Sequence, residues 1–204
     1  MHGRSVLIIV QNLPVPLDRR VWLECQALRD AGYTVSVICP KGPDDPSFAV
    51  LEGISLYKYR ATPATTGLLS YILEFAYCWL RTALLSVKVY RQQRFSVLQA
   101  CNPPDTYWLL ARFWKLFGVS FVFDHHDLNP ELFRSRFGEP KSRSARAQFA
   151  VLSWLERMTY RTADQVVVTN ESYQQIALTR GGRDEADVTV VRSGPDTSRM
   201  RGSG

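Results

Sequence analysis

The segment Phe121-Val-Phe-Asp-His-His-Asp-Leu-Asn-Pro-Glu131 joins a short apolar run to a cluster of ionisable side chains. A short apolar run is typical of a strand that is buried on both faces, as in a parallel sheet. Two of the three histidines, His125 and His126, follow this run between Asp124 and Asp127. Open α/β sheets bind ligands at the carboxyl ends of their strands. The segment therefore predicts a parallel sheet with a functional site where this strand ends.

The rest of the chain alternates between apolar runs typical of strands and amphipathic segments typical of helices. Strands are predicted over 6–10, 35–39, 54–59, 95–100, 119–123, 165–169 and 188–191. Helices are predicted over 18–31, 68–93, 102–118, 144–162 and 170–178. This alternation implies an α/β fold with a doubly wound, mostly parallel, Rossmann-like sheet and helices on both faces. We expect one such domain over residues 1–196, followed by a linker or tail over residues 197–204.

The turn after the first predicted strand lacks a dinucleotide-binding signature. Asn12-Leu-Pro-Val-Pro16 stands where a G-x-G-x-x-G loop would lie, and Pro40-Lys-Gly42 follows the second strand instead of an acidic residue. A dinucleotide site of the usual kind is therefore not expected. Asp18 predicts the N-cap of the first helix. Asn102 as N-cap with Pro103 at the first helical position predicts the start of another helix.

The predicted helix over 68–93 is unusually apolar. Its stripe consists of Leu69, Ile72, Leu73, Ala76, Leu80, Ala83, Leu84 and Val87. Glu74, Arg81 and Lys88 argue against a membrane span, because each would cost about 2.5–3.5 kcal/mol near the bilayer centre. Two interpretations remain open: the stripe packs on the core, or part of the helix contacts a membrane surface.

The charge balance favours anionic partners. The net charge is +6 with a pI of about 9.3, and basic residues crowd the segment 134–146. A phosphorylated ligand or an anionic membrane suits this segment, and a solvated basic surface is the alternative. Nucleic acid is not an expected partner, because no RNP-type or helix-turn-helix pattern accompanies the basic residues.

The four cysteines, Cys25, Cys39, Cys78 and Cys101, are widely spaced. This spacing argues against a zinc site and against a disulfide scaffold, so buried, reduced thiols in a cytoplasmic protein are expected. A strand is predicted so close to the N-terminus that it leaves no room for a signal peptide.

Several segments together carry a resemblance to a known family. They are Asp18-Arg-Arg-Val21, Gln26-Ala-Leu28, Ala31-Gly-Tyr-Thr-Val-Ser-Val-Ile-Cys-Pro40, Ala100-Cys-Asn-Pro-Pro-Asp105, Val122-Phe-Asp-His-His-Asp127, Ala163-Asp-Gln-Val-Val-Val-Thr-Asn-Glu-Ser172 and Val190-Val-Arg-Ser-Gly-Pro-Asp196. In order and spacing they resemble the N-terminal, acceptor-binding domain of family 4 glycosyltransferases. These are retaining enzymes with the two-domain GT-B architecture. The C-terminal donor-binding domain and its pair of glutamates are missing from this sequence.

The resemblance implies a set of site residues. His126 matches the histidine beside the transferring sugar, where it would hydrogen-bond a donor hydroxyl, whereas His125 is expected to be structural. Asp127 is expected to orient His126 or to accept a proton from the acceptor; helix capping is its alternative role. The expected substrate-binding residues, each with a capping or surface role as its alternative, are Asn12, Asp18, Arg19, Asn102, Asp105, Glu131, Asn170 and Glu171.

The expected function is the acceptor-binding half of a retaining glycosyltransferase. It would move a sugar from a nucleotide-sugar co-substrate to a hydroxyl acceptor, possible acceptors including lipid-linked sugars in surface polysaccharide or glycolipid assembly. No cofactor is expected in this domain, and the chain alone is expected to be inactive without a donor-binding domain. The alternatives are a non-catalytic binding module and one subunit of a split enzyme. Localisation is expected in the cytoplasm, with the inner face of the membrane as an option.

Overall fold

The computed structural model describes residues 4–61 and 68–192, with the side chains of 68–72 excepted. The predicted tail over 197–204 and residues 193–196 before it lie outside the described residues, as do the side chains of Leu69 and Ile72. The strands are β1 (Ser5–Ile9), β2 (Thr34–Pro40), β3 (Phe48–Leu51), β4 (Ile54–Tyr59), β5 (Val97–Cys101), β6 (Ser120–His125), β7 (Gln165–Val168) and β8 (Val188–Val190). The helices are α1 (Arg19–Asp30), α2 (Leu68–Gln93), α3 (Trp108–Lys115), α4 (Asn129–Phe137), α5 (Arg143–Thr162) and α6 (Glu171–Thr179), with a 3-10 turn at Glu185–Asp187.

The eight strands form one sheet in the order β3-β4-β2-β1-β5-β6-β7-β8. Every pair is parallel except β3 with β4, which is antiparallel. The chain builds outward from β1 to β4, then returns through α2 to β5 on the other side of β1. This reversal creates a topological switch point between β1 and β5, where open α/β sheets form a ligand crevice. The predicted fold class is confirmed.

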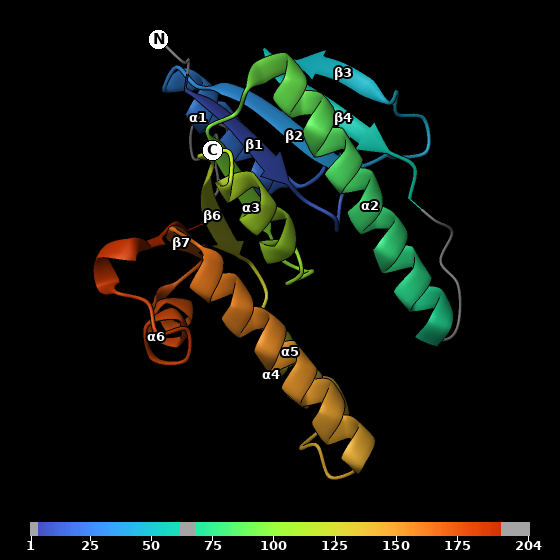
Figure 1. Cartoon of the computed structure of the whole chain (residues 1–204), viewed down its shortest axis with the longest axis vertical. Helices are drawn as coiled ribbons and strands as arrows, with labels where there is room; N and C mark the ends of the chain where they lie inside the picture. Colours follow the sequence, from blue (N-terminus) through green and yellow to red (C-terminus); the bar gives the residue numbers. More distant parts are fainter. Residues whose placement is uncertain (1–3, 62–67, 193–204) are drawn as a thin grey trace, which may run out of the picture.

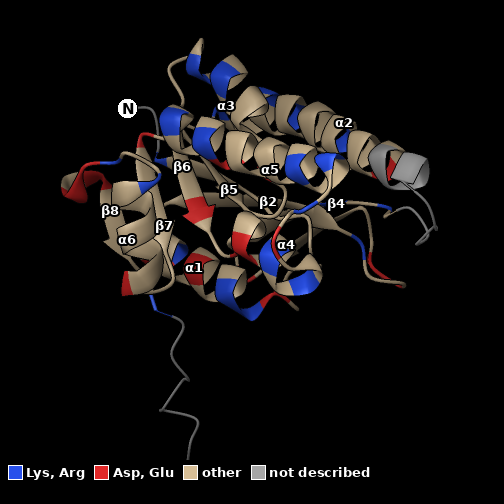
Figure 2. Ribbon diagram, turned by 90° about the horizontal axis from the view of Figure 1, so that it is seen from below, with Lys and Arg blue, Asp and Glu red and all other residues tan. Residues whose placement is uncertain are grey.

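Helices cover both faces of the sheet (Figures 1 and 2). One face packs against α1 through a buried cluster that includes Val21 and Cys25. The other face packs against α2, α3 and α5 through a larger cluster that includes Val89, Trp114 and Tyr160. All four cysteines are buried and free, as the sequence predicted.

Two local predictions were wrong. No strand was predicted over Phe48–Leu51, but this segment forms the edge strand β3 and turns tightly into β4 through Glu52 and Gly53, both with positive φ. The helix predicted to start at Asn102 starts at Trp108 instead. The side chain of Asn102 does not cap a helix, because it hydrogen-bonds the backbone of residues 126 and 127. Asp18, in contrast, caps α1 by accepting a hydrogen bond from the backbone N–H of Val21.

Only part of the apolar stripe of α2 packs on the core: Ala83 and Val87 do, whereas three of its leucines face outward. Leu73, Leu80 and Leu84 are all more than half exposed. The buried side of the helix carries Cys78, Thr82, Ser86 and Val89 instead. The two buried hydroxyl groups are satisfied, since Ser86 donates to the carbonyl of Ala83 and accepts from the indole of Trp114, and Thr82 meets the hydroxyl of Tyr107. In the described part of the chain, no helix combines the length and the hydrophobicity needed to cross a bilayer.

Candidate functional site

The candidate site begins where β6 delivers alternate side chains to opposite faces of the sheet. His125 points toward α5 and is fully buried, with its Nδ1 2.8 Å from the hydroxyl of Tyr160. Burial lowers the pKa of His125 to about 3, so this imidazole is neutral. The structural role predicted for His125 agrees with this packing.

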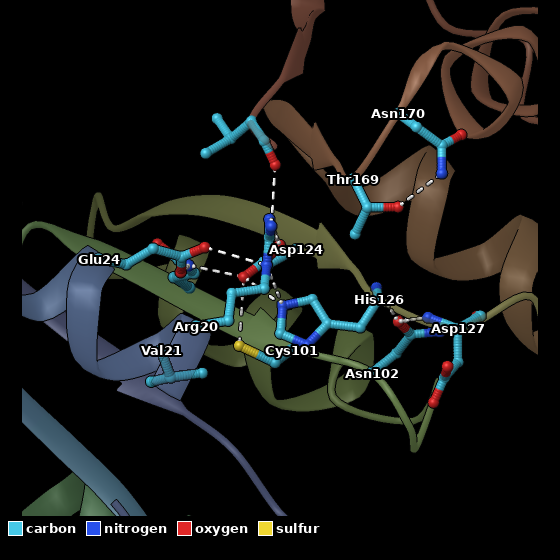
Figure 3. A network of polar contacts seen from close by, with 12 residues as sticks. Arg20, Val21, Glu24, Cys101, Asn102, Asp124, His126, Asp127, Thr169 and Asn170 are labelled. Carbon is cyan, nitrogen blue, oxygen red and sulfur yellow. Dashed lines mark hydrogen bonds and ion pairs between the residues drawn. The ribbon is translucent and has the colours of Figure 1, made fainter. Parts of the chain in front are cut away.

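Asp124 points to the opposite face, where it meets α1 (Figure 3). It is completely buried, and one of its oxygens accepts a hydrogen bond from the guanidinium of Arg20 at 3.2 Å. Its other oxygen lies 2.8 Å from Nε2 of His126 and 3.1 Å from the side-chain amide of Gln99. Burial alone would raise the pKa of Asp124, but His126 and Arg20 outweigh it and lower the pKa to about 2.

His126 therefore turns back over the end of β6 and is held by its Nε2 atom. Nε2 cannot both donate to Asp124 and accept from the Nε–H of Arg20, which lies 3.0 Å away. Burial disfavours charge on His126, but the Asp124 carboxylate favours it more strongly, and its pKa is raised. This favours an imidazolium that donates to Asp124, and the Nε atom of Arg20 also lies 3.2 Å from the Glu24 carboxyl group.

The other ring nitrogen of His126 is available to a ligand. Among the described residues, none forms a hydrogen bond with Nδ1, and 17% of the side chain is exposed. As an imidazolium, His126 presents an N–H donor at this atom. Its position is fixed by Asp124 at the other end of the ring, which is the arrangement that preorganised donors require.

Glu24 joins this cluster from the second turn of α1. Burial and the neighbouring Asp124 carboxylate raise the pKa of Glu24 to about 8. Two adjacent buried carboxyl groups cannot both ionise easily, so Glu24 retains its proton while Asp124 is ionised. Gln99 donates a hydrogen bond to each of them, at 2.9 Å to Glu24 and 3.1 Å to Asp124.

Asn102 holds the loop that carries His126. Its side-chain oxygen accepts from the backbone N–H of His126 at 2.7 Å and from that of Asp127 at 3.1 Å. Its side-chain nitrogen donates to the carbonyl of Asp127 at 2.6 Å. Since Asn102 follows β5, it ties the loop after β5 to the loop after β6.

A hollow of about 450 Å³ opens at the same carboxyl edge of the sheet. Its wall is formed by Pro14, Val15, Pro16, Leu17, Gly42, Asp45 and Lys58. The ammonium group of Lys58 is buried and lies 2.6 Å from the carboxylate of Asp45. A concave space beside fixed polar groups is the usual form of a small-molecule site.

Comparison with known families gives this arrangement a context. Residues 17–194 match the family model described as "Glycosyl transferase 4-like domain". The chain belongs to this family. No curated protein matches it in sequence.

Solved structures confirm the fold of this glycosyl transferase 4-like domain. Sucrose-phosphate synthase from Thermosynechococcus elongatus matches with a TM-score of 0.66 at 16% identity, over 96% of this chain and 49% of that chain. UGT2 from Phytolacca americana, complexed with UDP-2fluoro-glucose and pterostilbene, matches with a TM-score of 0.61 at 13% identity, over 96% and 54%. The catalytic domain of starch synthase IV from Arabidopsis thaliana, bound to ADP and acarbose, matches with a TM-score of 0.58 at 14% identity. This match covers 96% of this chain and 52% of that chain. The domain thus has the fold of the N-terminal half of a GT-B glycosyltransferase and spans about half the length of these proteins.

The glycosyl transferase 4-like domain places the expected site residues in different surroundings. Asp127 does not orient His126, because Asp124 occupies that position and the Asp127 carboxylate points away from the imidazole (Figure 3). It does not cap a helix either, since Leu128 holds the N-cap position of α4. Asp105 is buried and accepts a hydrogen bond from Asn129 at 2.5 Å, with its pKa raised to about 7 by burial.

The remaining expected residues divide between caps, ion pairs and the surface. Asn170 caps α6 by accepting from the backbone N–H of Tyr173, and the neighbouring Glu171 forms an exposed ion pair with Arg192. Glu131 lies in the first turn of α4 and forms an ion pair with Arg180 at the C-terminal end of α6. Asn12 and Arg19 are exposed at the carboxyl edge of the sheet and the start of α1.

Sequence reasoning missed Arg20 and Glu24. Their i,i+4 spacing on one helix face was the available signal, because it places both side chains toward the same strand ends. Arg19 was chosen instead, one position away and on the exposed side of α1.

The site does not favour a metal ion. Donor atoms of Cys101, Asp124 and His126 lie within 4.8 Å of one another. However, the Arg20 guanidinium already binds Asp124, and burial raises the pKa of the Cys101 thiol well above its usual value. A second cation and a thiolate ligand are both disfavoured there.

Proposed function

We propose that this chain is the acceptor-binding half of a retaining glycosyltransferase that transfers a sugar from a nucleotide-sugar donor to a hydroxyl acceptor. The observation that carries the proposal is His126, whose Nε2 is held by Asp124 while its Nδ1 remains available at the carboxyl edge of β6. Family membership supports sugar transfer as the general chemistry. The retaining mechanism rests on the resemblance to family 4 enzymes.

In this proposal His126 hydrogen-bonds a donor hydroxyl through Nδ1 and orients the reacting sugar. Asp127, half-buried on the same loop, is the group that accepts a proton from the acceptor hydroxyl. The nucleotide-sugar is a co-substrate that binds mainly to a donor-binding domain. This domain itself binds no cofactor.

The acceptor is proposed to enter the hollow beside Lys58, in contact with the loop from Asn12 to Asp18. A lipid-linked or phosphorylated acceptor in surface polysaccharide or glycolipid assembly suits the net charge of +6. The protein would then work peripherally at the cytoplasmic face of an anionic membrane.

Two alternatives make different predictions. A non-catalytic binding module would hold the acceptor without needing the His126 imidazole for transfer. A subunit of a split enzyme would require a separate polypeptide that supplies the donor-binding domain, and such a partner would co-purify with the chain.

The test is the His126→Ala variant in an assembled two-domain enzyme. Loss of a preorganised donor lowers kcat by roughly 10²-fold or more, so sugar transfer from radiolabelled nucleotide-sugars should fall by at least that factor. Glu185→Gln, an exposed position on the 3-10 turn, serves as the control and should leave kcat unchanged. An unchanged rate for His126→Ala would remove the catalytic role and favour the binding module.

A further inference from the structure

Three helices of one sheet face expose large apolar side chains along their outer sides. On α2 they fall at helical spacing opposite the buried side of the helix. The same pattern recurs on α3 with its C-terminal turn and on α5. The exposed residues are Leu73, Tyr77, Leu80, Leu84, Leu109, Phe113, Leu116, Phe117, Val151 and Trp154. We call this set the α2–α3–α5 face.

α3 packs against both α2 and α5, so it joins the exposed side chains of the three helices into one face. Trp114 of α3 donates to Ser86 of α2 at 3.1 Å. Trp108 of α3 packs edge-on against Trp154 of α5, with ring centroids 5.7 Å apart. Monomeric proteins rarely expose this many neighbouring large apolar side chains unless they bind a partner.

The same helices are strongly basic. They contain nine cationic side chains, Arg81, Lys88, Arg91, Arg112, Lys115, Arg143, Arg146, Arg157 and Arg161. Their acidic residues are only Glu74 and the buried Glu156, which forms an ion pair with Arg180. Within the described chain, Lys115 alone of the nine forms an ion pair, with Asp164. Figure 2 shows the basic positions recurring along all three helices, whereas acidic residues gather elsewhere.

We propose that the α2–α3–α5 face docks on an anionic lipid surface. Apolar side chains flanked by Lys and Arg are the composition that binds the headgroup and acyl boundary of such a membrane. A second copy of this chain fits less well, because face-to-face contact would bring two cationic surfaces together. Nucleic acid would leave the leucine and phenylalanine side chains without apolar contacts.

The orientation that follows suits the proposed function, on which this part of the inference rests. α2 and α5 start at the carboxyl edge of the sheet and project beyond the strands (Figure 1). With the α2–α3–α5 face on the membrane, the edge that carries His126 and the hollow would lie beside the lipid surface. An acceptor with a lipid anchor could then reach the site without leaving the membrane.

The first experiment measures co-sedimentation of the purified chain with vesicles of phosphatidylcholine alone and with added phosphatidylglycerol. The chain should bind only the anionic vesicles. The double variant Leu80→Glu/Leu84→Glu should bind at least tenfold more weakly, and each of Arg143→Gln and Arg157→Gln about fivefold more weakly. The matched control is Leu23→Glu on α1, on the opposite face of the sheet, which should bind like the wild type.

A second measurement places the contact on the α2–α3–α5 face. Trp154 is the one exposed tryptophan, since Trp108 and Trp114 are buried and Trp22 and Trp79 are half-buried. Brominated lipids should quench wild-type fluorescence, and Trp154→Phe should lose most of that quenching while it still binds. Wild-type failure to bind anionic vesicles, equal binding by the leucine double variant, or formation of a dimer or a stable protein complex through this face would overturn the proposal. Because vesicle binding is read without substrate, it is independent of the activity assay with His126→Ala.

Discussion

At the scale of single residues, the contacts around Asp124 determine how the folded protein binds protons. Burial and Asp124 raise the pKa of Glu24 from 4.5 to about 8, and Asp124 raises that of His126 above 6.5 in spite of burial. For both groups the folded state holds protons that the unfolded chain has released. The free energy of unfolding contributed by this cluster is therefore highest in mild acid, and it falls as the pH rises from 4.5 through about 8.

The variant Glu24→Gln should remove much of this fall. Glutamine resembles the protonated glutamic acid, so the free energy of unfolding should match that of the wild type near about pH 5. Above about pH 8 the variant should be more stable than the wild type by on the order of 2 kcal/mol. Each pKa unit is worth about 1.4 kcal/mol, and Arg20 offsets part of the cost because it stabilises the ionised Glu24 of the wild type. Urea unfolding across this pH range measures the difference, with the exposed Glu139→Gln as a control. A variant less stable than the wild type at high pH would contradict the assignment of the proton to Glu24.

Asn102 is a positioning residue for His126, and replacing it should lower both the free energy of unfolding and the activity. Asn102→Ala leaves the backbone N–H groups of His126 and Asp127 without their acceptor. A buried donor without a partner costs about 1–3 kcal/mol, so urea unfolding should show a loss of roughly 2 kcal/mol. In an assembled enzyme kcat should fall as well. The exposed Asn12→Ala should stay within about 0.5 kcal/mol of the wild type in stability, and equal losses from both variants would argue against the role of Asn102.

At the scale of helices and strands, Arg180 joins three helices through two carboxylates. It forms an ion pair with Glu131 of α4 and one with Glu156 of α5, at 2.7 Å, from the C-terminal end of α6. Glu156 is almost fully buried, so it depends on Arg180 for its charge balance.

Arg180→Met should lower the free energy of unfolding by about 3 kcal/mol, because it leaves the Glu156 carboxylate buried without a counter-charge. The double variant Arg180→Met/Glu156→Gln should recover a large part of this loss, since the buried charge is gone. A double-mutant cycle by urea unfolding measures the coupling. Purely additive losses would mean that the ion pair does not balance the buried charge.

The alternation of strands and helices was sufficient to predict the sheet and most of its elements. Periodicity could not tell which side of α2 faces the core, because the buried side carries two hydroxyl residues, Thr82 and Ser86. Two of the partners that satisfy these hydroxyls, Tyr107 and Trp114, lie far along the chain. The start of α3 was misplaced for a related reason. Asn102 and Asp105 have capping chemistry, but their side chains serve contacts with residues 126, 127 and 129, which lie far along the chain.

The candidate site was predictable in position but not in its contacts. His126 follows a buried strand, so its place at the carboxyl edge followed from topology. Its partner did not, because Asp124 and Asp127 both lie within two residues of His126 in sequence, and only the strand register decides which carboxylate faces the imidazole. Arg20 enters the site through the packing of α1, which depends on the whole sheet.

At the scale of the whole molecule, the fold places an edge rich in polar groups next to a basic, apolar helical face. The two surfaces are built from different elements, since the polar site lies on α1, β5 and β6, whereas the exposed apolar side chains lie on α2, α3 and α5. Vesicle binding and sugar transfer should therefore respond to different substitutions. Leu80→Glu/Leu84→Glu should leave transfer to a water-soluble acceptor unaffected in an assembled enzyme, and it should slow transfer to an acceptor embedded in anionic vesicles.

The purified chain is expected to show no sugar transfer above background, because it spans about half the length of the GT-B structures it resembles and presents one side of the expected crevice. Sugar transfer requires the donor to be held against the acceptor, and that alignment supplies a large share of the rate. Adding a donor-binding domain, fused or as a separate polypeptide, should raise kcat into the range of roughly 1–10³ s⁻¹ that enzymes commonly show. Radiolabelled nucleotide-sugars and a hydroxyl acceptor provide the assay, with the donor-binding domain alone as the control. Transfer at such a rate by this chain in isolation would show that its own edge holds both substrates.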